Sequence, residues 1–383
     1  MDSRVLLSNG GANTVRSPGA GSSRMIIGTV DGVFVLSGAG TDWSVTTRAL
    51  EGCAVGAVTQ LQSGTIVAAT HGLGVARSVD GGDSWDWCNE GLEYFDLWAA
   101  RSGVLQGRDV AIIGSMPAHL MISTDDALTW AEAPALREVD SFDQWCFPPP
   151  PRLGHVKEIV IDGDRLFVGI EIGALLRSDD SGATFTDLRI DPDPRECDIH
   201  RLLIDPRDRR RLIAAVGLVG FMRSDDDGAN WSRDPVLSAL EYPDAFVMHP
   251  DRPELLFVAA GVGWPPQWYA RGRAQGRIAR STDGGAHWER LLGGLPDGQR
   301  SLFSALSIDV HERGFTLFAA DTDGQLFVSL DGGDRWTMVA DIAPVSKGEF
   351  HRALTKGRPR IAGVDDIVFN PAAAERLAAA SGD

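Results

Sequence analysis

The stretch Ser78-Val79-Asp80-Gly81-Gly82-Asp83-Ser84-Trp85 contains a pattern, Ser-x-Asp-x-Gly-x-x-Trp, that returns along most of this chain of 383 residues. Copies begin at Ser78, Ser123, Ser178, Ser224, Ser281 and Ser329; Ala127 replaces the glycine in the second copy and Phe185 the tryptophan in the third. Consecutive copies are roughly 45 to 57 residues apart, the interval of a propeller blade or a solenoid unit. The repeat alone therefore predicts a modular fold.

Each copy is expected to form a tight turn between two strands. An apolar run such as 74–77 precedes the motif, and another strand-like run follows it. The aspartate can accept hydrogen bonds from nearby backbone N–H groups, the glycine supplies a positive φ, and the tryptophan fills the gap between neighbouring sheets.

On these residues the sequence resembles the Asp-box (BNR) repeat proteins, which include sialidases, xyloglucanase-type glycosidases, sortilin-like receptors and photosystem II assembly factors. The resemblance covers about 25–370 and implies a β-propeller, but it does not imply one activity. We predict an all-β fold, a single seven-bladed β-propeller with Asp-box turns, in which N- and C-terminal segments close one blade. Closure removes free sheet edges.

The blades can be placed on the sequence. Blades two to seven are expected to begin near Cys53, Phe95, His155, Asp198, Tyr242 and Leu302. Blade one is expected to combine 25–50, with a degenerate Asp box at 37–43, and a C-terminal strand at 363–371. Residues 1–24 are predicted to be a disordered leader because they are rich in Gly, Ser and Asn, 25–371 the propeller, and 372–383 a tail.

Composition restricts the function classes. The net charge of −17 argues against a nucleic-acid or anionic-membrane surface, since either needs a basic field. No apolar run approaches the ~18 residues of a membrane span, and the leader lacks the apolar core of a secretory signal. The cysteines Cys53, Cys88, Cys146 and Cys197 lack metal-like spacing and are expected to be free thiols, so we predict a cytoplasmic protein.

The turn lengths predict which face of the ring binds a ligand. The turns between first and second strands are short, and the Asp boxes occupy the same face. Long insertions at 137–154, 261–277 and 341–362 all belong to the opposite face. Long loops in a compact domain are typical of binding elements, so a pocket is expected there, at the channel mouth.

Ionisable residues are expected around this mouth. Alignment of the inner strands predicts a ring that contains Lys157, His200 and Asp244, and the ends of the second strands add His71 and Glu171. His155 precedes Lys157 by two. We predict catalytic roles for His200, Glu171, Asp244 and Lys157, in which a carboxylate beside His200 works as a general acid and base pair.

Imidazoles and carboxylates around a funnel also suit a divalent metal, and His71, His155, His200 and Glu171 are the candidate ligands. The alternative is that these groups are hydrogen-bonded polar residues filling a wet channel. No HxH or HExxH spacing decides between the two.

The long loops supply candidate substrate-binding residues. Trp264, Trp268 and Tyr269 could stack on a sugar or aryl face, or could pack the insertion against its own blade. His351 and Arg358 lie in the last loop, and Arg358 belongs to a basic group that could receive an anion or form a mobile lid.

Two classes of function remain after the family activities are tested on the residues. Sialidase activity is disfavoured, because the chain lacks a Phe/Tyr-Arg-Ile-Pro segment and has only three tyrosines. Xyloglucanase-type enzymes use two propellers, whereas one ring fits here. The first prediction is a hydrolase or lyase acting on a small polar, glycosidic or aromatic substrate, with or without a metal. The alternative is a non-catalytic scaffold that binds a protein partner.

Overall fold

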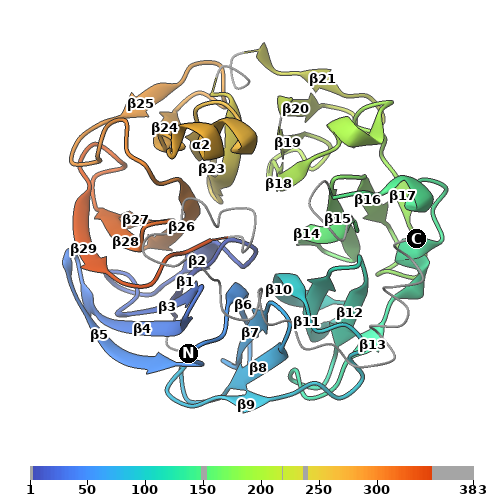
Figure 1. Ribbon diagram of the computed structural model, residues 1–383, viewed down its shortest axis with the longest axis horizontal. Coiled ribbons are helices and arrows are strands. Elements are labelled where there is room, and N and C mark those ends of the chain that lie inside the picture. Colours follow the sequence, from blue (N-terminus) through green and yellow to red (C-terminus); the bar gives the residue numbers. More distant parts are fainter. Residues whose placement is uncertain (1–2, 148–152, 218, 236–239, 347–383) are drawn as a thin grey trace.

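The structure is a computed structural model that describes residues 3–147, 153–217, 219–235 and 240–346. The described residues form seven small sheets arranged as a ring (Figure 1), which confirms the predicted seven-bladed β-propeller. Blades two to seven begin at or close to the predicted positions. The four cysteines are free thiols.

Blades two to four each consist of four consecutive antiparallel strands, with the first at the channel and the last at the rim. They are β6 (Val55–Gln60), β7 (Ile66–Thr70), β8 (Gly74–Ser78) and β9 (Asp86–Trp87); β10 (Leu97–Leu105), β11 (Arg108–Ser115), β12 (Leu120–Ser123) and β13 (Ala131–Glu132); and β14 (His155–Asp162), β15 (Arg165–Glu171), β16 (Leu175–Ser178) and β17 (Thr186–Asp187).

Blades five to seven repeat this order. Their strands are β18 (Ile199–Ile204), β19 (Leu212–Val216), β20 (Gly220–Ser224) and β21 (Ser232–Arg233); β22 (Tyr242–His249), β23 (Arg252–Gly261), β24 (Arg277–Ser281) and β25 (Glu289–Leu291); and β26 (Phe303–His311), β27 (Gly314–Asp321), β28 (Gln325–Ser329) and β29 (Thr337–Asp341). The hydrophobic core lies between adjacent blades: Phe257, Phe327 and Trp336, for example, share one buried cluster.

The Asp boxes form the turns between third and fourth strands, as predicted. In the first copy, Ser78 Oγ donates to Asp80 (2.8 Å) and accepts from the amide of Gly82 (2.8 Å). Gly82 has a φ of +93°, a conformation that favours glycine. Trp43 Nε1 donates to Gly40 O (2.9 Å), just as Trp85 Nε1 donates to Gly82 O, so the turn within 37–43 keeps the tryptophan contact of an Asp box.

These turns predict a loss of stability in acid. The hydroxyl of Thr129 donates to Asp125 (2.7 Å), and together with further hydrogen bonds it lowers the pKa of Asp125 from 3.8 to about 2. A carboxyl whose pKa is lower in the folded state stabilises the protein above pH 3.8, and this contribution disappears as the pH falls through 2. We expect Asp125→Asn to be less stable than the wild type at pH 7, and the difference to shrink at pH 2.5 in urea titrations. Asp86→Asn, an exposed change on β9, serves as the control; a pH-independent difference for Asp125→Asn would contradict the assignment.

The N-terminal segment is part of the ring. β1 (Val5–Leu7) pairs in parallel with β3 (Arg24–Thr29), which continues into β4 (Gly32–Ala39) and β5 (Asp42–Ala49) as blade one, and β2 (Thr14–Arg16) pairs in parallel with β26 (Figure 1). The prediction of a disordered leader is therefore wrong for residues 3–24. The strand expected at 363–371 and the tail at 372–383 lie outside the described residues, and β1 holds the inner position beside β3.

Between β1 and β2, residues 8–13 cross the channel; we call them the crossing segment. The amides of Gly10 and Ala12 donate to Gly56 O (2.9 Å) and Val58 O (3.1 Å) of blade two. Asn13 O accepts from the amide of Ile308 (3.0 Å) in blade seven. The chain itself thus bridges the channel.

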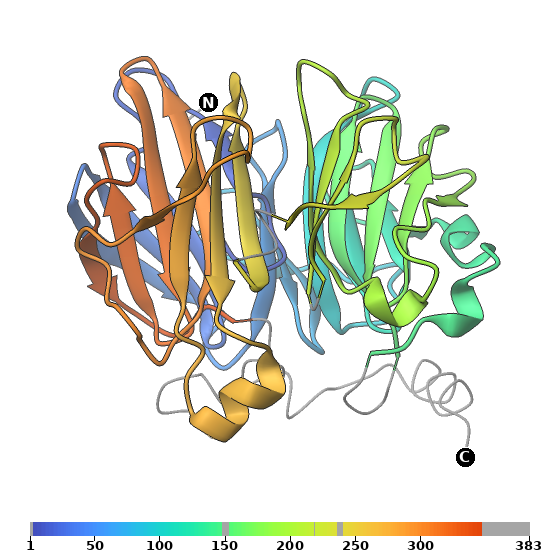
Figure 2. The same ribbon diagram turned by 90° about the horizontal axis from the view of Figure 1, so that it is seen from above.

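Short helices lie in and beside the connections between blades. η1 (Pro134–Arg137) leads into the first insertion, η2 (Phe142–Gln144) lies within it, and η3 (Pro194–Glu196) precedes β18. α2 (Pro265–Arg271) lies in the second insertion, follows β23 and projects from one face of the ring (Figure 2). The amide of Cys146 donates to Ile172 O (3.0 Å), which places the first insertion beside the end of β15. Among the residues described, no helix is long and apolar enough to span a bilayer.

Candidate functional site

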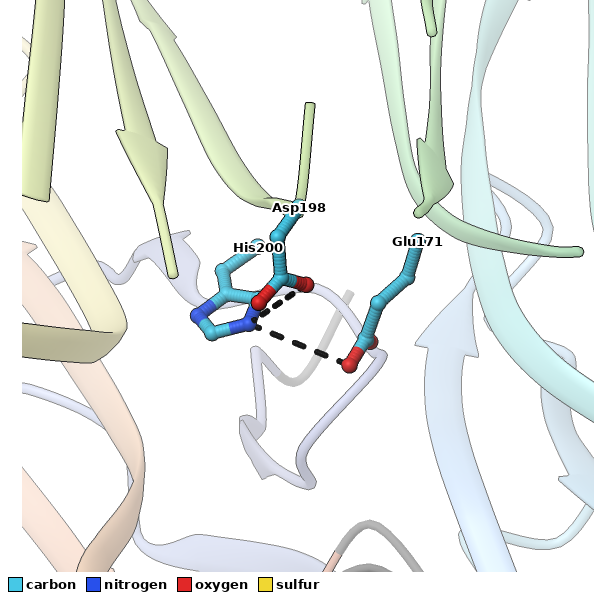
Figure 3. Close-up of side chains that lie close together, drawn as sticks. All are labelled: Glu171, Asp198 and His200. Carbon is cyan, nitrogen blue, oxygen red and sulfur yellow. Dashed lines mark ion pairs between the residues drawn. The ribbon is translucent and has the colours of Figure 1, made fainter. Parts of the chain in front are cut away.

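Inner strands bring together a buried polar cluster at the end of the channel that bears the long insertions. Glu171 ends β15, Asp198 directly precedes β18, and His200 is the second residue of that strand (Figure 3). His200 Nε2 lies 3.2 Å from Asp198 Oδ1 and 3.8 Å from Glu171 Oε1. Glu171 and His200 are fully buried, and Asp198 is 6% exposed. Two predicted catalytic residues, His200 and Glu171, therefore meet across adjacent blades.

The other ring nitrogen of His200 fixes its orientation. Nδ1 lies 2.5 Å from the backbone oxygen of Pro243. A carbonyl oxygen can only accept, so Nδ1 carries a proton. In the neutral imidazole, Nε2 then has a lone pair that points toward the two carboxylates. This is the arrangement by which a backbone carbonyl orients a metal-bound histidine.

The donor atoms fit a divalent cation. One ligand atom from each of Glu171, Asp198 and His200 can be chosen so that all lie within 4.8 Å of one another. Asp198 Oδ1 is buried and makes no hydrogen bond to any residue the structure describes. Two buried carboxylates facing an imidazole lone pair repel one another, and a cation among them would remove that repulsion. Imidazole with carboxylates suits ions such as Zn²⁺ or Mn²⁺.

Tyr242, the first residue of β22, completes the cluster. Its hydroxyl lies 3.3 Å from Asp198 Oδ2 and 3.3 Å from His200 Nε2. Burial, followed by the negative charges of Asp198 and Glu171, raises the pKa of Tyr242 well above 10. The phenol therefore stays protonated at neutral pH and serves as a hydrogen-bond donor.

The four predicted metal ligands are only partly brought together. His155 Nε2 lies 3.3 Å from Glu171 Oε2, on the side away from His200. His71 is separated from His155 by Trp98, whose ring lies 4.6 Å from His71 and 3.9 Å from His155. His71 instead pairs with Asp96 (Nδ1 to Oδ1, 2.9 Å). Among the described residues, Asp198 takes the place in the candidate metal group that the sequence assigned to His71 and His155.

Lys157 and Asp244, the other two predicted catalytic residues, lie deeper in the channel. Lys157 Nζ donates to Asn9 Oδ1, and Asn9 Nδ2 donates to Asp244 (3.2 Å) and to Ser304 O (3.0 Å). All three side chains are buried. The crossing segment thus holds both residues in place below the cluster.

The aromatic residues predicted to bind the substrate, Trp264, Trp268 and Tyr269, do not share one role. Trp268 is fully buried in α2, stands edge-on to Tyr242 (5.0 Å between ring centres) and donates to Val262 O (3.0 Å), so it packs the insertion onto blade six. Trp264, which precedes α2, is 41% exposed. The side chain of Tyr269, and all of His351 and Arg358, lie outside what the structure describes.

Two members of the cluster, Asp198 and Tyr242, are absent from the predicted site. A signal for both was present in the sequence. The predicted site includes His155, which stands two residues before Lys157. Asp198 and Tyr242 stand two residues before His200 and Asp244 in the same way. Side chains two apart on a strand share a side, so the offset could have been applied to every blade.

Comparison with known proteins supports the fold. The chain matches no family model and no curated protein. Its structure is similar to an ancestral GH74 enzyme (TM-score 0.57, 16% identity, 76% of this chain and 40% of the other) and to a GH74 enzyme from Niastella koreensis (0.54, 15%, 86% and 55%). It is also similar to YCF48 bound to a D1 peptide (0.50, 18%, 74% and 80%). The chain therefore spans about half the length of these GH74 enzymes, and at such identities the likeness shows a shared β-propeller fold alone.

Proposed function

We propose that this protein is an enzyme, a hydrolase or lyase, that binds a divalent metal through Glu171, Asp198 and His200. The substrate in this proposal is a small polar molecule, glycosidic or aromatic, reached from the face with the long insertions. One observation carries the proposal: three buried ligand atoms converge from two adjacent blades, with the His200 lone pair directed at them. A divalent ion at this position would supply Lewis acidity.

The side chains around this group suit proton transfer. Glu171 Oε2 lies 3.3 Å from His155 Nε2, so this carboxylate can exchange a proton with the His155 imidazole while His200 holds the metal. The neutral phenol of Tyr242 can donate a hydrogen bond to an oxygen that gains negative charge during the reaction. Lys157 and Asp244 support the cluster from below through Asn9.

The long insertions complete the proposal on the substrate side. Trp264 offers an exposed ring on the face where the cluster lies, and an exposed indole can stack on a sugar or aryl ring. Tyr269, His351 and Arg358 are further candidates for substrate contacts. A cytoplasmic location remains part of the proposal.

Metal content and turnover test the proposal together. We expect the purified protein to hold about one divalent ion per chain by elemental analysis, and Asp198→Asn and His200→Ala to lose it. On a panel of aryl glycosides and esters, Glu171→Gln and His200→Ala should lower turnover at least about 100-fold. His287→Ala is the matched control, because His287 is an exposed Asp-box histidine in another blade.

A metal-free protein without turnover would contradict this function. The same result, with no small molecule stabilising the fold, would favour a scaffold that presents this face to a protein partner. Among the similar structures, YCF48 was solved bound to a peptide, so a binding assay for extended peptides belongs in the same experiment.

A further inference from the structure

A cavity lined by both polar and apolar side chains lies at the other end of the channel. Its volume is about 370 Å³, and Arg101, Glu158, Asn13, Thr14, Met248 and Pro250 are among its lining residues. We call Glu171, Asp198 and His200 the metal cluster. β14 runs from His155, beside Glu171, to Asp162 at this cavity, so the two sites lie near opposite ends of the same strand. We call it the distal cavity; the crossing segment lies between it and the metal cluster.

Two lining residues of the distal cavity, Arg101 and Glu158, belong with the neighbouring Arg201 to an unbalanced group of charges. Glu158 binds Arg101 Nη2 through both carboxylate oxygens (3.2 Å each) and Arg201 Nη1 through one (2.7 Å). Side-chain exposures are 13% for Arg101, 4% for Glu158 and 3% for Arg201. Two buried guanidinium groups thus share a single carboxylate, which leaves one positive charge in excess.

The neighbouring charged groups do not remove this excess. At the rim, Arg209 pairs with Asp162 (2.5 Å), which also pairs with Arg165 (2.5 Å). On the other side of the group, Lys157 and Asp244 both bind Asn9 and offset one another. The remaining contacts of the two arginines are neutral: Arg101 donates to Gly10 O (3.2 Å) and Arg201 to Asn9 O.

Both arginines retain donor capacity. Arg201 Nε is buried without a hydrogen bond to any residue the structure describes. Arg101 donates through Nη1 to Gly10 O and Ala100 O and through Nη2 to Glu158, which leaves its Nε without a described partner. Burial, opposed by Glu158 and reinforced by Arg201, lowers the pKa of Arg101. A buried cation with unused donors is costly, and an anion in the adjoining cavity would reduce that cost.

We propose that the distal cavity is a binding site for a small oxyanion, a phosphate or a carboxylate, held by Arg101. Arg101 Nε is the donor that either group could bind, since Nη1 and Nη2 already contact backbone oxygens and Glu158. Thr14, Asn13 and Ser102 add polar atoms to the cavity wall. The site is independent of the proposed enzyme function, because it shares no residue with the metal cluster.

Two variants that should change the affinity for phosphate in opposite directions test the proposal, with inorganic phosphate as the probe. Calorimetric titration of the full chain, at constant ionic strength set with chloride, should show saturable binding. Arg101→Gln should weaken it at least about tenfold. Arg101→Gln leaves Glu158 and Arg201 as a one-to-one pair, so the fold has a balanced charge pair to retain. Arg207→Gln removes an exposed arginine from the same face, outside the cavity lining, and should bind as the wild type does.

Glu158→Gln is expected to raise the affinity for phosphate. Without its carboxylate, Arg101 in the cavity wall and the neighbouring Arg201 carry a larger excess charge, so phosphate should bind more tightly and raise the melting temperature more than in the wild type. Acetate in place of phosphate distinguishes a carboxylate site from a phosphate site. Absence of phosphate and acetate binding to the wild type, or equal affinities for the wild type and Arg101→Gln, would overturn the proposal.

Discussion

Alanine at Gly10 is expected to lower the free energy of unfolding by about 3 kcal/mol or more, as overpacking against a rigid backbone does. A Cβ added at Gly10 would lie 1.9 Å from the backbone oxygen of Trp98, which belongs to the inner strand of blade three and cannot move independently. The crossing segment would have to withdraw from the channel. The hydrogen bonds of the Gly10 and Ala12 amides to blade two would then be lost.

Hydrogen exchange and urea unfolding together measure this effect. In Gly10→Ala the amides of residues 10 and 12 should exchange faster, while amides of the outer strands remain protected. Gly19→Ala is the control in the same N-terminal segment: no atom lies within 4 Å of its added Cβ, and its φ of +63° costs alanine roughly 1 kcal/mol. Equal stabilities for the two variants would show that the crossing segment does not hold the ring together.

The outer parts of the blades were predictable because their information is local. Ser78, Asp80 and Gly82 satisfy one another within five residues, and six copies of that turn place the strands around it. The blade boundaries followed from the spacing of the copies.

The centre of the ring was not predictable by the same means. β1 pairs with residues about twenty positions away and β2 with β26, near the other end of the described chain, and neither pairing leaves a repeat in the sequence. The run Ser8-Asn9-Gly10-Gly11 has the composition of a disordered leader. Its glycines are instead required by close backbone contacts, since a Cβ at Gly11 would lie 2.3 Å from Val58 O.

Only part of the candidate site was predicted, because strand alignment gives the positions of residues along the strands but not the contacts of their side chains. Ring closure was enough to bring Glu171 near His200, because both lie at the same end of neighbouring inner strands. Which other residues join them depends on side-chain packing. Trp98 inserts between His71 and His155, and Asn9 binds Lys157 and Asp244, and neither contact is visible in strand alignment.

Asparagine at Asp321 is expected to stabilise the protein at pH 8 by up to about 3 kcal/mol. Asp321 ends β27 and is fully buried, and burial raises its pKa from 3.8 to about 6. A carboxyl with a raised pKa binds its proton more tightly in the folded state, so the wild type loses stability as the pH rises from 3.8 to 6 and stays penalised above that range. Asparagine does not ionise. Its oxygen can still accept from the amides of Asp323 and Gln325, and its amide can donate to Ser301 Oγ.

The pH dependence separates this explanation from a general packing effect. The gain of Asp321→Asn over the wild type, measured by urea unfolding, should be largest at pH 8, decline as the pH falls from 6 to 3.8 and vanish by about pH 3, where the wild-type carboxyl is protonated in both states. Asp42→Asn, a change at the exposed first residue of β5, should show no comparable gain at any of these pH values. A gain that persists unchanged at low pH would indicate a packing effect instead of ionisation. A loss of stability at pH 8 would mean that the backbone amides around Asp321 need a charged acceptor.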